Sequence, residues 1–115
     1  MSAPVGEIVP ETSAVAIREA EPGRVTIAGE LTFATARAAR LTGLEVLESV
    51  RGKAQSIVLD CSLVSRADSA GLAVLLDWLA WSRRKAQPLR LENLPASLLA
   101  IARISEVDGL LTDAR

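Results

Sequence analysis

The amino-acid sequence predicts one α/β domain with a mixed β-sheet and the element order ββαβαβα. The chain has 115 residues, which is the usual size of a single domain. Residues 14–30 carry the pattern of a β-hairpin. After it, short apolar runs alternate with longer segments of helix-forming residues, and this alternation is typical of right-handed crossovers between parallel strands.

The hairpin is the first element. Four apolar residues alternate with small or charged neighbours, as in half-buried strands: Val15, Ile17, Val25 and Ile27. Between the two pairs, Pro22 presets φ and Gly23 can supply the positive φ of a type II turn. Two prolines, a glycine and small polar residues precede the hairpin. We therefore interpret residues 1–12 as a flexible tail and residues 13–115 as the domain.

The first helix is expected over residues 33–50, because this segment is rich in alanine, leucine, arginine and glutamate. Thr32 stands in the position of its N-cap. Two arginines fall close to the helix side that carries Phe33: Arg37 and Arg40. This makes the apolar face imperfect, and Gly43 is a potential break or kink in the helix.

A continuous apolar run at residues 57–59 is typical of a central strand that is covered on both faces. Asp60 is expected to cap or orient the loop after this strand. A second helix is expected over residues 69–86, where Pro88 stops it.

The last elements are shorter. Residues 89–91 form another strand, and Pro95 suits the first turn of a third helix. Residues 106–115 are expected to form a polar end without a further element.

The composition excludes several classes of function. The net charge is −1, which does not favour binding to nucleic acid or to an acidic membrane. The chain has no histidine and no tyrosine, and its carboxylates show no metal-ligand spacing, so we expect no enzyme, no cofactor and no metal. The single cysteine, Cys61, favours a cytoplasmic location, and no apolar run is long enough to insert into a membrane.

Two motifs resemble a known family. The stretch "IVLDCSLVSRADSAGLAVLL" begins at residue 57 and contains "DSAGL", residues 68–72, while "AGEL" occupies residues 28–31. This sequence resembles the STAS domain (sulfate transporter and anti-sigma-factor antagonist) over residues 14–111. The resemblance implies a mixed sheet with helices packed mainly on one face.

Within that family, "LDxSxVSRxDxxGLAxLL" is similar to the small cytoplasmic STAS subunit of the Mla phospholipid-transport ABC complex. This implies a non-catalytic regulatory and assembly subunit, which binds the cytoplasmic ATPase and, through it, an inner-membrane permease. It would lie in the cytoplasm, peripheral to the inner membrane. The other stand-alone branch is the anti-sigma-factor antagonists, which implies that Ser69 is a phosphoacceptor. Ala70 departs from that branch, which usually carries a second serine or threonine there.

Ser69 and its neighbours allow more than one interpretation. From the residues alone, Asp68 and Ser69 cap the second helix. With the resemblance, Ser69 faces a partner, and a phosphate would be tolerated at a helix N-terminus. Gly71 permits close approach either of a partner or of the sheet.

The second helix is apolar on two sides. Its leucines form an ordinary core face, while Val74, Trp78 and Trp81 lie nearly opposite, with Ala70 at the edge. The first helix or the chain ends could cover this side, but an exposed stripe would mark an interface, and we favour the interface. The predicted partner-binding residues are Asp68, Ser69, Ala70, Gly71, Val74, Trp78 and Trp81. Full burial of Trp78 and Trp81 would contradict the interpretation of this side as an exposed interface.

Overall fold

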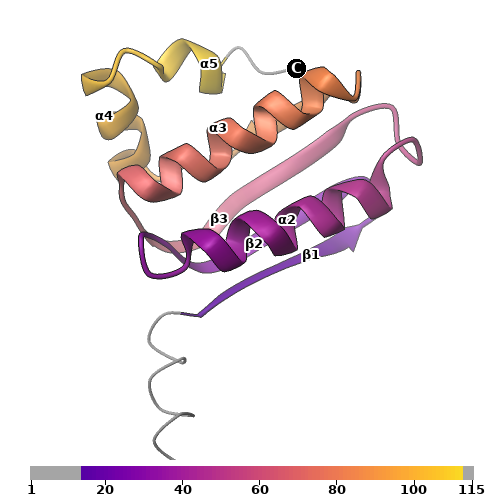
Figure 1. Cartoon of the computed structure of the whole chain (residues 1–115), viewed down its shortest axis with the longest axis horizontal. Helices are drawn as coiled ribbons and strands as arrows, with labels where there is room; N and C mark the ends of the chain where they lie inside the picture. The colour runs from indigo at the N-terminus through magenta and orange to yellow at the C-terminus, as the bar shows by residue number, and fades with distance from the viewer. Residues whose placement is uncertain (1–13, 113–115) are drawn as a thin grey trace, which may run out of the picture.

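The structure, a computed structural model, describes residues 14–112 (Figure 1). The elements are β1 (Val15–Glu21), β2 (Arg24–Leu31), α2 (Ala36–Val50), β3 (Ile57–Ala67), α3 (Ser69–Arg84), β4 (Leu89–Glu92), α4 (Ala96–Ile104) and α5 (Asp108–Thr112). The segment interpreted as a flexible tail, residues 1–12, lies outside the described residues.

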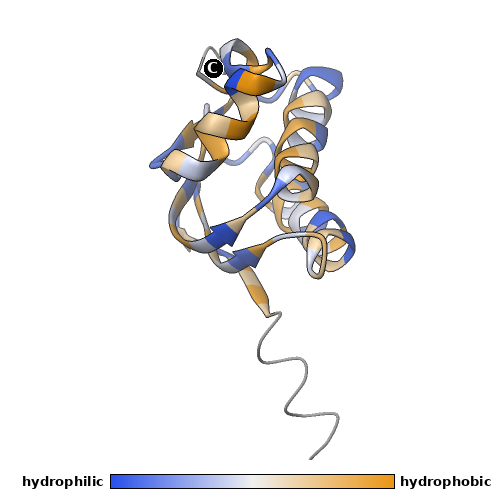
Figure 2. Ribbon diagram, turned by 90° about the vertical axis from the view of Figure 1, so that its left-hand side faces the viewer, coloured by the Kyte–Doolittle hydropathy of each residue, from blue (hydrophilic) through white to orange (hydrophobic). Residues whose placement is uncertain are grey.

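The strands form one mixed sheet in the order β1-β2-β3-β4. β1 is antiparallel to β2, and the next two pairings are parallel. The helices α2 and α3 connect the parallel strands and lie side by side on one face of the sheet (Figures 1 and 2). The predicted α/β class, the mixed sheet and the order ββαβαβα are confirmed.

The core lies between the sheet and these two helices. Its fully buried side chains come from every part of this sandwich: Val25, Ile27 and Leu31 on β2, Ile57 and Leu59 on β3, Leu47 and Val50 on α2, and Leu75 and Trp78 on α3. Burial on this scale stabilises a domain by roughly 25 cal/mol for each Å² of apolar surface removed from water. The core therefore packs α3 against α2 and the sheet, and this packing sets the position of its N-terminal end.

The hairpin turn is confirmed, with Gly23 at φ +78°. The start of the first helix was placed too early. Helix α2 begins at Ala36, and Thr35 precedes it as the N-cap. The hydroxyl of Thr35 accepts from the N–H of Thr32 (3.0 Å) and donates to the carbonyl of Glu30 (2.8 Å). These bonds hold the chain in a tight loop, and this loop presents Phe33 to solvent.

Two further expectations are wrong at the ends of elements. Strand β3 continues through Asp60 to Ala67, because β2 pairs with it along that whole length. The continuous apolar run in the sequence covers only the start of this strand. Strand β4 pairs with residues 57–60 alone, and the later residues of β3 are largely exposed. The chain also forms α5 near its end, where Leu111 is buried.

Candidate functional site

Asp68 joins the two helices at one end of the domain. It is the N-cap of α3, and its Oδ1 accepts hydrogen bonds from the backbone N–H groups of Ala70 (2.9 Å) and Gly71 (3.1 Å). Its Oδ2 accepts from the N–H of Phe33 (3.0 Å), in the loop before α2. The bond from Phe33 and then those from α3 lower the pKa of Asp68, so the carboxylate is charged at neutral pH. One side chain therefore fixes Phe33 beside the start of α3.

Ser69 is the first helical residue of α3 and is exposed. The prediction that Asp68 and Ser69 share the cap is corrected, because Asp68 alone accepts the N–H groups of the first turn. The hydroxyl of Ser69 makes no hydrogen bond within residues 14–112. It is therefore open to solvent at the positive end of the helix dipole.

Gly71 belongs to the interior. It is buried, and a Cβ at this position would overlap the backbone carbonyl of Leu31 at the end of β2. Close packing of α3 on the sheet therefore explains why this position requires a residue without a side chain. We do not retain Gly71 as a partner contact.

The exposed stripe predicted for α3 is wrong. Val74 is buried, and Trp78 and Trp81 have 0% and 2% of their surface exposed. Helix α2 covers them: Gly43 lies against the ring of Trp78, and the Nε1–H of Trp81 donates to Glu48 (2.8 Å). Of the two interpretations of this side, coverage by the first helix is the correct one.

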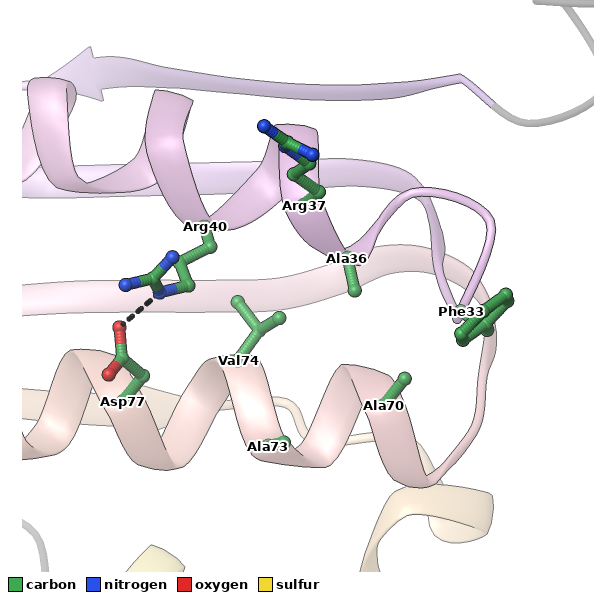
Figure 3. A pocket seen from close by; sticks show the side chains of 8 residues that line it. All are labelled: Phe33, Ala36, Arg37, Arg40, Ala70, Ala73, Val74 and Asp77. Atoms are coloured by element: carbon green, nitrogen blue, oxygen red, sulfur yellow. Dashed lines mark hydrogen bonds and ion pairs between the residues drawn. The ribbon is translucent and has the colours of Figure 1, made fainter.

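A shallow groove of about 480 Å³ lies between the first turns of α2 and α3 (Figure 3). Its walls are Phe33, Ala36, Arg37, Arg40, Ala70, Ala73, Val74 and Asp77. The ring of Phe33, which is 85% exposed, stands at one end. At the other end Arg40 reaches across to Asp77 (3.2 Å) (Figure 3). The groove is thus apolar along its floor and charged at its rim.

Sequence reasoning missed Phe33 as a surface residue, because it assigned Phe33 to the core face of the helix. A usable signal was present, since Arg37 and Arg40 fall close to the side on which a helix over residues 33–50 would carry Phe33. An aromatic side chain beside two arginines belongs to an exposed surface more readily than to a core.

Asp60 lies in a network on the sheet face opposite α2 and α3. The side-chain amide of Asn93 (3.0 Å) and the N–H of Ser62 (2.9 Å) donate to it, and both lower its pKa. Arg24 pairs with Asp60 and with Glu92, each at 3.1 Å. The network links β2, β3 and β4, so Asp60 joins strands instead of orienting a loop.

Other candidate chemistry is limited. Burial raises the pKa of the Cys61 thiol to about 12, which leaves it unreactive at neutral pH. Within residues 14–112, no three acidic or cysteine side chains gather as they would around a metal ion. No helix in the same range has the length and hydrophobicity needed to cross a membrane.

The comparison with protein families gives one match. The model of a family described as "Mlab, STAS domain" matches residues 15–112. A search of curated proteins finds no match.

Several solved structures share the fold. The anti-sigma factor antagonist SpoIIAA in its unphosphorylated form is 18% identical, with a TM-score of 0.61 over 83% of each chain. The Bacillus cell-fate determinant SpoIIAA in its phosphorylated form is 19% identical, with a TM-score of 0.60 over 86% of this chain and 88% of that one. SLC26A9 is 17% identical, with a TM-score of 0.60 over 73% of this chain and 16% of its own. At these identities the likeness concerns the fold alone.

Proposed function

Because the chain belongs to the STAS domain family, in the group described by the MlaB-like model, we propose that it is a subunit of a bacterial ABC phospholipid transporter. Its role is non-catalytic: it regulates and assembles the complex. It binds the cytoplasmic ATPase through the Ser69 end of α3, and through the ATPase it is linked to an inner-membrane permease. This places it in the cytoplasm, peripheral to the inner membrane.

The observation that carries the proposal is the surface that Asp68 organises. Its carboxylate holds the loop of Phe33 against the first turn of α3, where Ser69 is exposed. The side chain of Phe33 is 85% exposed, so its burial does not stabilise the isolated domain. Exposed aromatic residues are favoured anchors of protein interfaces. We define the docking surface as Phe33, Ser69, Ala70 and Ala73.

This surface replaces the one expected from the sequence. Ser69 and Ala70 are retained from that set, and Asp68 contributes by positioning them. Phe33 and Ala73 take the place of the buried residues of α3. The docking surface therefore crosses from the loop before α2 to the first turns of α3, instead of running along α3.

A second candidate function is an anti-sigma-factor antagonist that is controlled by phosphorylation of Ser69. The exposed hydroxyl of Ser69 at the N-terminus of α3 favours it, because the helix dipole stabilises added negative charge there. The neighbouring carboxylate of Asp68 opposes that charge, so a phosphate would act on a partner more than on the fold.

The test is a pull-down of the tagged full chain from its native cells, read by mass spectrometry. Recovery of an ATPase together with a membrane permease is the expected result. Recovery of a kinase-like anti-sigma factor would instead support the second candidate and overturn the first.

A further inference from the structure

We infer that the groove between α2 and α3 binds an acidic amphipathic helix of the ATPase, an inference that rests on the proposed function. An apolar side chain of that helix would lie on the groove floor, and carboxylates beside it would reach Arg40 at the end of the groove and Arg37 on the outer side of α2. The shape of the groove floor, the two ends of the groove and the charge of its rim favour such a helix.

The floor is made by small side chains on both helices. Ala36 on α2 and Ala70 and Ala73 on α3 project only a methyl group, and Val74 completes the floor between them (Figure 3). The groove is too open to enclose a small molecule, but its 480 Å³ can accept side chains from an element laid along it. A groove between two helices is a common receptor for the apolar face of a third.

The two ends of the groove differ in chemistry, which gives a ligand a preferred direction. Phe33 supplies a broad apolar surface at one end, and the loop that carries it is fixed by its N–H bond to Asp68. The ion pair of Arg40 and Asp77 closes the other end. Both partners of this pair are partly exposed, so water weakens their attraction and an incoming carboxylate can compete for Arg40.

The rim carries an excess of positive charge. Its charged residues are Arg37, Arg40 and Asp77, which leaves one positive charge beyond the paired carboxylate. Arg37 makes no ion pair within the described residues, and its guanidinium extends from α2 away from α3 (Figure 3). A partner helix with a carboxylate near its apolar anchor complements this rim, whereas a basic helix would be repelled.

The inference is tested by photocrosslinking within the complex of the full chain with the purified ATPase subunit of the same transporter. Benzoylphenylalanine replaces Ala73, which is exposed in the groove, or Ser97, which is exposed on α4 as a control. The expected result is a crosslink from position 73, but not from position 97, to an ATPase helix with Asp or Glu within one turn of an apolar residue.

Three outcomes would overturn the inference. They are an intact complex without a crosslink at position 73, a crosslink to a segment that lacks acidic residues, and a crosslink to a second copy of this chain. The first two leave the proposed function standing. If no complex forms with the unsubstituted chain, the proposed function fails, and this inference fails with it.

A charge reversal gives an independent readout. The variant Arg37→Glu/Arg40→Glu is expected to weaken binding of the purified ATPase about tenfold or more, with a smaller loss at high salt. The control is Arg83→Glu/Arg84→Glu, at the exposed far end of α3, which is expected to bind within about twofold of the unsubstituted chain. Equal binding by both variants, with circular dichroism showing both to be folded, would contradict the inference.

Discussion

Gly43 of α2 packs directly against the indole ring of Trp78 of α3, so closely that a methyl group on Gly43 would overlap the ring. The glycine lies inside a continuous helix, where it costs about 1 kcal/mol relative to alanine. The close approach explains why it stands there, and it also explains why Trp78 is completely buried. This contact turns the apolar side of α3 into core, so Trp78 does not contribute to an exposed interface.

Replacing Gly43 by alanine is therefore expected to destabilise the domain. The gain in helix propensity is about 1 kcal/mol, whereas overpacking a rigid contact costs about 1–3 kcal/mol. Urea unfolding followed by tryptophan fluorescence measures the difference, with Thr42→Ala on the exposed side of α2 as the control. A Gly43→Ala variant that is more stable than the unsubstituted chain would show that the contact is not tight.

Truncating Trp78 to alanine should lower the free energy of unfolding by about 3–5 kcal/mol, because the whole indole is buried. Binding to the ATPase should then fall only in proportion to the unfolded fraction, which circular dichroism measures in the same samples. A Trp78→Ala variant that remains folded but no longer binds would restore Trp78 as a direct partner contact.

Asp68→Ala should cost about 1–2 kcal/mol, because α3 loses its N-cap and the loop of Phe33 loses its anchor. The effect should depend on pH with a definite sign. The pKa of Asp68 is lower in the folded state, so its stabilisation is present above the unfolded pKa of about 4 and is lost as the pH falls through the folded pKa. The difference between Asp68→Ala and the unsubstituted chain should therefore shrink in acid. A difference that grows in acid would contradict this account of Asp68.

Phe33→Ala should weaken ATPase binding by about ten- to a hundredfold, as expected for an exposed aromatic anchor. It should change the free energy of unfolding by less than about 0.5 kcal/mol, because the side chain is already in water. Ile104 on α4 is a matched control, since it is 83% exposed and lies outside the groove. Ile104→Ala should leave binding unchanged, and equal losses for the two variants would place the interface elsewhere.

The fold was predictable because its signals are local. The hairpin pattern, the turn at Gly23 and the alternation of strands with helices each depend on neighbouring residues, and all three are confirmed. The cap at Asp68 was equally local, since an acidic residue before a helix has one obvious role.

The exposed surface could be predicted only in part, because burial depends on which helix covers which. A helical projection shows that Trp78 lies opposite the leucine face of α3. It cannot show that Gly43 of α2 leaves room for the indole ring of Trp78 between the two helices. Likewise, the position of Phe33 depends on the loop that Thr35 and Asp68 hold in place, and neither bond follows from periodicity.

Binding of the ATPase through the Ser69 end of α3 can be tested by titration of the purified ATPase with two matched variants. Ser69→Glu adds a charge on this surface, while Ser97→Glu adds the same charge in the exposed first turn of α4. We expect Ser97→Glu to bind like the unsubstituted chain and Ser69→Glu to bind at least about tenfold more weakly, a loss of roughly 1.4 kcal/mol. Binding of Ser69→Glu with undiminished affinity would contradict it.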